Sequence, residues 1–252
     1  MTASRPRAVF FDAGNTLIFP RVDQLAEELT AQGYPATVED FYAAERAGKQ
    51  KLASWLLPQI ESGQIPRLVD LTYWLEYLRA LAERIGVPAG ARDQVMRRVG
   101  ERFADVELWS RVLPDTPPFL DSLRAEGYSL AVISNSNGII EQQLARVDLA
   151  RRFDFILDSH VVGVEKPRPE IFHMALERAG VEAREAVFVG DSYATDIAGA
   201  RTAGLRGVLF DDVGVYDHSG DQLDCPRITA LPQLAGVLEG LSGSAHVVPS
   251  EA

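Results

Sequence analysis

Short apolar runs alternate with amphipathic stretches over the second half of the chain, from about residue 113 to residue 210. Apolar runs bounded by turn residues are typical of buried strands, whereas apolar positions three or four residues apart predict helices. On this basis strands are predicted at 129–134, 153–157, 186–190 and 207–210, and helices at 116–127, 139–147, 169–179 and 194–203. Strands that alternate with helices predict right-handed βαβ units and a parallel sheet, the Rossmann-like α/β class.

A first strand stands apart from the others, at residues 9–11, and a long helical stretch follows it. Between residues 22 and 110 we find no strand-like run, and the apolar residues 68, 71, 75, 78 and 81 fall on one face of a helix. We therefore expect an α/β core formed by residues 1–18 and 113–240, with an all-helical cap domain, residues 19–112, inserted after the first strand. The tail, residues 241–252, has little to pack and is expected to be disordered.

The composition is that of an ordinary globular protein, with 252 residues, 46% apolar residues and a formal net charge of −11. This negative charge disfavours nucleic acids and anionic membranes as partners, because like charges repel. No apolar run is long enough to cross a bilayer, and the first strand leaves no room for a signal peptide. The single cysteine, Cys225, excludes an internal disulfide, so we expect a cytoplasmic protein, whose oligomeric state stays open.

Residues that can carry chemistry follow the predicted strands, and a parallel sheet would gather them along one edge. Three carboxylates among them offer the hard oxygen ligands that Mg²⁺ prefers, with waters and a phosphate oxygen completing an octahedron. Lys166 would balance these carboxylates and hold a phosphoryl oxygen. Ser134 and the backbone amides that follow it would donate hydrogen bonds to the same phosphoryl group. In chain order the residues are Asp12, Ser134, Asn135, Lys166, Asp191 and Asp196.

The segments around these residues resemble the four motifs of the haloacid dehalogenase (HAD) superfamily, in order and in spacing, from residue 9 to residue 210. The first is Asp-x-x-x-Thr-Leu from Asp12, and the second is the serine after the second strand. The third is Lys-Pro-x-Pro from Lys166, and the fourth is Gly-Asp-x-x-x-x-Asp, which ends at Asp196. Each motif alone is a weak signature of the family, and the four together are a strong one. The helical stretch resembles the cap of the subfamily with an inserted α-helical domain.

The resemblance implies hydrolysis of a small phosphorylated metabolite. Asp12 would be the nucleophile, forming an aspartyl-phosphate that water then hydrolyses. Asp12, the backbone carbonyl of Gly14 and Asp191 would hold Mg²⁺. Asp196 would support this site through water or Lys166. The residues that would bind the phosphoryl group are Ser134, Asn135 and Lys166.

Gly14 departs from the family's phosphatases, which carry at that position an aspartate that protonates the leaving group and later activates water. General acid–base catalysis is worth about 10²–10⁴-fold, so the departure reopens the reaction class. The family's dehalogenases, which need no metal, and its phosphonatases, which use a cap lysine, also lack this aspartate. Because dehalogenases do not keep the acidic pair of the fourth motif, Asp191 and Asp196 favour a phosphatase. A protein that binds a phosphorylated metabolite, or a partner, without turnover is the remaining alternative.

Several other residues have plainer interpretations. Lysine occurs only at positions 49, 51 and 166, and Lys49 and Lys51 are interpreted as part of a solvated helix face, which disfavours a Schiff base. The pair Asp211 and Asp212 predicts a solvated turn. The remaining assignments are a turn residue for Asn15, a surface residue for His160, and core filling for Trp55, Trp74 and Trp109.

Overall fold

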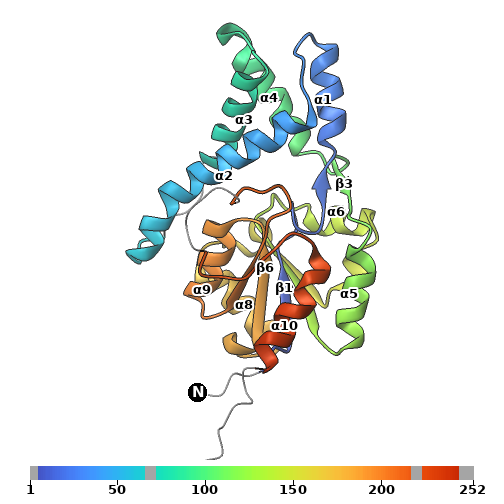
Figure 1. Ribbon diagram of the computed structural model, residues 1–252, viewed down its shortest axis with the longest axis vertical. Coiled ribbons are helices and arrows are strands. Elements are labelled where there is room, and N and C mark those ends of the chain that lie inside the picture. Colours follow the sequence, from blue (N-terminus) through green and yellow to red (C-terminus); the bar gives the residue numbers. More distant parts are fainter. Residues whose placement is uncertain (1–4, 66–71, 217–222, 244–252) are drawn as a thin grey trace, which may run out of the picture.

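The computed structural model describes residues 5–65, 72–216 and 223–243, and it has two parts (Figure 1). The lower part is an α/β core and the upper part is helical. In chain order the core elements are β1 (Ala8–Phe11), α5 (Thr116–Ala125), β4 (Ser129–Ser134), α6 (Ile140–Arg146), β5 (Phe155–Asp158), α7 (Ser159–Val162), α8 (Pro169–Ala179), β6 (Ala186–Gly190), the π-helical turn η4 (Tyr193–Ile197), α9 (Ala198–Thr202), β7 (Arg206–Phe210), β8 (Arg227–Ile228) and α10 (Leu234–Gly243).

The core is built on one six-stranded sheet with the strand order β5-β4-β1-β6-β7-β8. Every neighbouring pair is parallel, and β1 lies between β4 and β6. Phe11 pairs with Val132 on one side and with Val189 on the other, so the residues that follow these strands emerge at the same level. The Rossmann-like fold predicted from the alternation of strands and helices is confirmed, and Asp12 directly follows the central strand β1.

Helices cover both faces of this sheet, which is why β1 is apolar at every position. Val9 and Phe11 pack on one side with residues of α5, α6 and α10. Ala8 and Phe10 pack on the other side with residues of α8 and α9. When the residues on both faces of a strand contact apolar layers, every position of the strand is apolar, as in the sequence of β1.

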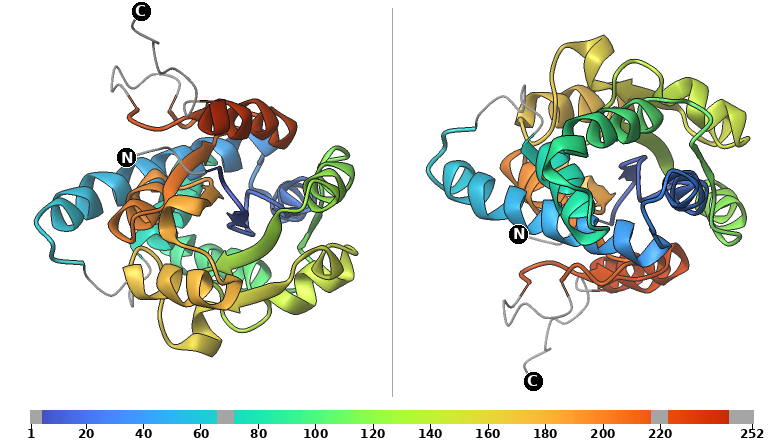
Figure 2. Two further views of the ribbon diagram at one scale, coloured as in Figure 1. Left: turned by 90° about the horizontal axis from the view of Figure 1, so that it is seen from below. Right: turned by 90° about the horizontal axis from the view of Figure 1, so that it is seen from above.

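The helical part has its own apolar core, separate from the two clusters of the sheet. Its elements are α1 (Val22–Ala31), α2 (Val38–Glu61), α3 (Thr72–Arg84), a short turn η1 (Ala89–Ala91) and α4 (Arg92–Phe103). Two short strands, β2 (Phe19–Pro20) and β3 (Trp109–Arg111), pair antiparallel where the chain leaves and re-enters the core. Seen from above, these helices lie over the core (Figure 2).

Three predicted segments differ in detail from the observed elements. The predicted helix 194–203 begins with the wider turn η4, and the predicted helix around residues 68–81 is seen as α3, with 68–71 outside the described residues. Of the predicted tail, residues 241–243 end α10 and the remainder lies outside the described residues. No helix in the described ranges has both the length and the apolar character needed to cross a membrane.

Candidate active site

The edge of the sheet where the strands end brings Asp12, Lys166 and Asp196 into direct contact. The Lys166 ammonium nitrogen Nζ lies 2.5 Å from Asp12 Oδ1 and 2.7 Å from Asp196 Oδ1. All three side chains are buried. The backbone amide of Asp12 donates to the carbonyl of Val189, so the first residue after β1 is still tied to β6.

Asp191, directly after β6, has a second lysine as its partner. Lys49 of α2 lies with Nζ 2.6 Å from Asp191 Oδ2 and 2.7 Å from Glu45 Oε1, one helical turn earlier. The interpretation of Lys49 as solvated is wrong, since its side chain is only 6% exposed, whereas Lys51 is exposed as expected. Helical periodicity in α2 does not reveal which face meets the core, and for this reason the sequence did not identify Lys49.

The three aspartates form one cluster that is suited to a divalent cation. Asp12, Asp191 and Asp196 each offer a carboxylate oxygen within 4.8 Å of the others. With Glu45 there are four carboxylates against the two ammonium groups of Lys49 and Lys166, which leaves a buried negative excess. Buried charges need opposite charges or a metal to offset the loss of water, and hard oxygen ligands suit Mg²⁺.

Burial shifts the ionisation of this cluster strongly. Burial raises the pKa of Asp12 to about 7; Lys166 opposes that shift, while Asp196 and Asp191 add to it. Burial likewise raises the pKa of Asp191 to about 6, against the lowering effect of Lys49. For Lys166, burial alone would lower the pKa, but the neighbouring Asp12 and Asp196 outweigh it and raise the pKa above its ordinary value. Such shifts are typical of functional sites.

Small residues allow the fourth motif to fold this way. A Cβ at Gly190 would overlap the Asp196 carboxylate, so a side chain there is incompatible with this placement of Asp196. The same carboxylate accepts a hydrogen bond at 2.9 Å from the backbone amide of Ser192, the residue before the wide turn η4. Gly199 in α9 likewise permits the close approach of the loop that carries Lys166. A Cβ at this position would lie 2.8 Å from the Cα of Pro167 and would push that loop away.

Asn135 and Ser134 hold different places in the loop after β4. The Asn135 amide accepts from the Lys166 backbone N–H at 2.8 Å and donates to its carbonyl at 2.9 Å. Asn135 therefore fixes the loop that carries the lysine. Ser134 is buried at the end of β4, on the same cavity floor as Asp12. His160 is exposed, as expected, and lines the same cavity.

A cavity of about 1000 Å³ opens above these residues, between the core and the helical part. Its floor holds the residues predicted from the strand ends, namely Asp12, Gly14, Ser134, Asn135, Lys166, Asp191 and Asp196. Its opposite wall comes from α2, α3, α4 and β3. The sequence-predicted residues are thus brought together at one site, and the wall that faces them was not predicted from the sequence.

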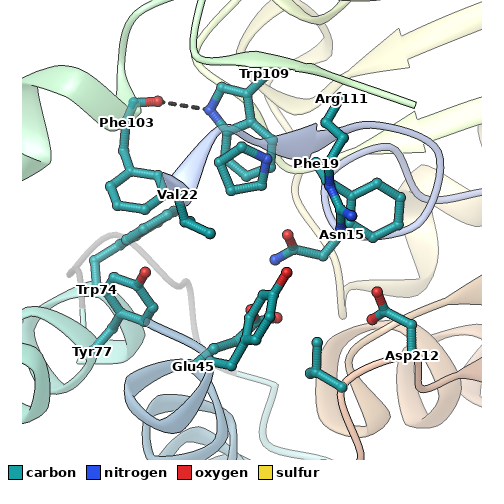
Figure 3. Close-up of a pocket in the computed structure, with 13 residues that line it drawn as sticks. Asn15, Phe19, Val22, Glu45, Trp74, Tyr77, Phe103, Trp109, Arg111 and Asp212 are labelled. Atoms are coloured by element: carbon teal, nitrogen blue, oxygen red, sulfur yellow. Dashed lines mark hydrogen bonds between the residues drawn. The ribbon is translucent and has the colours of Figure 1, made fainter. Parts of the chain in front are cut away.

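Trp109 of β3 covers Gly14 from this wall. A Cβ at Gly14 would lie 3.1 Å from the Trp109 ring, which is closer than an ordinary contact. The Trp109 indole nitrogen donates to the Phe103 carbonyl at 2.9 Å, which fixes the ring (Figure 3). Trp74 and Trp109 pack against the helical core, whereas the prediction of core filling is wrong for Trp55, which is 39% exposed.

Beside the cavity, a small pocket lies between Asn15 and Asp212 of the core and the aromatic residues of the helical part (Figure 3). The predicted solvated turn at 211–212 is wrong. Asp211 is buried, accepts from the Val215 amide and pairs with Arg227 at 2.8 Å. Burial raises the pKa of Asp212 to about 6, and Glu45 adds to that shift. Asn15 has φ of +55°, in keeping with its prediction as a turn residue.

Comparisons with known proteins agree with the motifs. A profile of the haloacid dehalogenase-like hydrolase family matches residues 6–204. The mouse protein named haloacid dehalogenase-like hydrolase domain-containing protein 3 is 32% identical over 239 residues, 93% of each chain. A phosphoserine phosphatase from Thermus thermophilus is 31% identical over 220 residues, 81% of each chain. The crystal structure of a 2-haloacid dehalogenase from Pseudomonas syringae is 28% identical with a TM-score of 0.55, covering 93% of this chain and 99% of that one.

Proposed function

Because the chain belongs to the haloacid dehalogenase-like hydrolase family, we propose that it is a Mg²⁺-dependent phosphatase acting on a small phosphorylated molecule. The observation that carries this proposal is the buried cluster of Asp12, Asp191 and Asp196, whose negative excess suits a divalent cation. A relative that is 31% identical is named as a phosphatase, which supports the same substrate class.

In the proposed reaction an Asp12 carboxylate oxygen attacks phosphorus. The bond from phosphorus to the ester oxygen breaks, and the leaving group departs with the electron pair. Water then attacks the phosphorus of the aspartyl-phosphate, which restores the Asp12 carboxylate and releases inorganic phosphate. Covalent catalysis of this kind divides one difficult displacement into two easier ones.

The surrounding residues would bind and orient the reacting groups. Asp12, the Gly14 carbonyl and Asp191 would hold Mg²⁺, which supplies positive charge to the phosphoryl oxygens when bound. Lys166 would hold a phosphoryl oxygen and Ser134 would donate a hydrogen bond to the phosphoryl group. Asp196 would keep Lys166 in place through their 2.7 Å contact.

We further propose that residues 19–112 act as a cap domain over a core formed by 1–18 and 113–240. The wall that this cap domain contributes to the cavity would exclude water and select the substrate. The cytoplasmic location also remains part of the proposal. It is consistent with the single cysteine, Cys225, which excludes an internal disulfide.

The test is phosphate release from 4-nitrophenyl phosphate, with Mg²⁺ and then with EDTA. We expect turnover that requires Mg²⁺, is lost in Asp12→Asn, and is retained in Asp115→Asn, a change at an exposed surface position. Halide release from 2-haloacids in EDTA would instead identify a dehalogenase. Binding of phosphorylated compounds with no turnover of any would identify a binding protein and overturn the proposal.

A further inference from the structure

The wall that the helical part gives to the cavity carries an apolar patch with three aromatic rings, alongside the charged residues Lys49, Asp93 and Arg97. Trp74 and Leu78 of α3, Met96 and Phe103 of α4, and Trp109 of β3 line it. The rings form one cluster, with Phe103 at 5.0 Å from Trp74 and at 6.1 Å from Trp109 between centroids. Aromatic clusters of this kind give large apolar contact areas to a flat ligand.

The size of the cavity also limits the choice of ligand. At about 1000 Å³ it matches the upper range of pockets that bury drug-sized molecules. A phosphoryl group on the floor with a two- or three-carbon polar substituent would leave the aromatic wall in contact with water. Leu75, which lines the same cavity and is 45% exposed, extends this apolar surface toward solvent.

The contact between Gly14 and Trp109 determines what can stand next to Asp12. Because a Cβ at Gly14 would already lie 3.1 Å from the Trp109 ring, a proton-donating side chain at this position would require the ring to move. A leaving group on this side of Asp12 would therefore contact the carbon atoms of the Trp109 ring. Of the charged residues that line the cavity from the helical part, Lys49 is held between Asp191 and Glu45, whereas Asp93 and Arg97 lie on α4.

We propose, on the basis of the phosphatase function proposed above, that the substrate is the phosphate monoester of an aromatic hydroxyl compound. Its ring packs against Trp109, Phe103 and Trp74, and its phosphoryl group lies on the floor beside Asp12. When the bond from Asp12 to phosphorus forms, the bond from phosphorus to the aryl oxygen breaks and the electron pair leaves on that oxygen. An aryl oxide delocalises this charge into the ring and takes up a proton from water after departure, so no acid is needed at position 14.

A panel of phosphate esters separates the two parts of this proposal. The esters of 4-methylphenol and benzyl alcohol are isomers of similar shape, but only the first releases a stabilised anion. We expect kcat/KM to be at least about 10-fold higher for the 4-methylphenyl ester, since it does not depend on a proton donor. We expect kcat/KM to be about 10-fold higher for 2-naphthyl phosphate than for phenyl phosphate. The difference should arise from a lower KM, because a larger ring covers more of the wall. Phosphoserine and glyceraldehyde 3-phosphate should be the poorest substrates.

A matched pair of variants tests the wall itself. Met96→Gln places an amide in the aromatic wall, whereas Met174→Gln makes the same change at an exposed position of α8 that does not line the cavity. We expect Met96→Gln to raise KM for 2-naphthyl phosphate about 5- to 10-fold with kcat little changed, and so to lower the ratio of kcat/KM for 2-naphthyl phosphate to that for phosphoserine. Met174→Gln should match the parent protein on every ester.

The outcomes separate this inference from the phosphatase proposal. Comparable or faster turnover of the polar phosphates, or equal turnover of the two isomeric esters, would overturn the aromatic substrate class while phosphatase activity stands. Phosphate release from no ester in the panel, or release that persists in Asp12→Asn, would overturn the phosphatase proposal itself. Circular dichroism spectra that match the parent protein would show that Met96→Gln is folded.

Discussion

Lys49 of the helical part lies 2.6 Å from Asp191 of the core, so an ion pair between two buried side chains joins the two parts across the cavity. The same ammonium lies 2.7 Å from Glu45 on its own helix. In the protein without metal, Lys49 therefore supplies positive charge to a carboxylate that we propose as a Mg²⁺ ligand. We therefore expect the stability of the protein and its metal binding to be coupled at this residue.

Replacing Lys49 by methionine should destabilise the metal-free protein and strengthen its response to Mg²⁺. Two buried carboxylates lose their cation, which costs about 3 kcal/mol of the free energy of unfolding when one member of a buried pair is removed. Urea unfolding in EDTA measures this loss, and a Mg²⁺ titration of the same variant measures the response. Lys51→Met, two residues along and exposed, is the control and should change neither. Equal stability of the two variants in EDTA would contradict the expectation.

Mg²⁺ should stabilise the parent protein by binding its folded form. At a free Mg²⁺ concentration about 100 times the Kd, linkage predicts a gain of about 2.7 kcal/mol, seen as a higher Tm. Asp191→Asn removes a proposed ligand and should abolish most of that gain, whereas Asp115→Asn should keep it. An unchanged Mg²⁺ response in Asp191→Asn would exclude Asp191 as a ligand.

Gly14 and Trp109 should be energetically coupled. Gly14→Ala places a Cβ 3.1 Å from the Trp109 ring and should cost about 1–3 kcal/mol, the usual range for overpacking. In a Trp109→Leu background the same change should cost about 1 kcal/mol less, because the ring is no longer there. A double-mutant cycle by urea unfolding measures the coupling. Gly90→Ala, where a Cβ would meet nothing within 4 Å, should have little effect. Additive costs would contradict the contact.

Asp212 should make the stability depend on pH. Burial, with Glu45 as the next contributor, raises the pKa of Asp212 from 3.8 to about 6, so the folded protein holds a proton that the unfolded chain releases. Its contribution is therefore favourable below about pH 4 and is lost as pH rises through about 6, a change of up to about 3 kcal/mol. Asp212→Asn should raise Tm at pH 7.5 and leave it nearly unchanged at pH 4. The Tm of the control Asp115→Asn should match that of the parent protein at pH 4 and at pH 7.5. If the Tm of Asp212→Asn does not rise at pH 7.5, the raised pKa of Asp212 is contradicted.

The sheet and the residues on its edge could be predicted because they follow from local patterns. Apolar runs locate the strands, and a parallel sheet fixes where Asp12, Lys166 and Asp191 emerge. Two of the failures, Lys49 and Asp212, lie at contacts between the two parts. Lys49, Trp55 and Asp212 each sit in a local sequence that suits either a solvated or a buried position, and only the tertiary packing decides which applies.

Pairing of β2 with β3 has a consequence for how the cavity opens. The chain leaves the core through β2, which begins seven residues after Asp12, and returns through β3, which carries Trp109. These strands are the joint between the two parts, and one of them also forms the aromatic wall over Gly14. A rotation of the helical part about this joint would carry α3 and α4 away from the core and would admit solvent above Asp12. Departure of the organic product and arrival of the hydrolytic water would then share a single mechanical step.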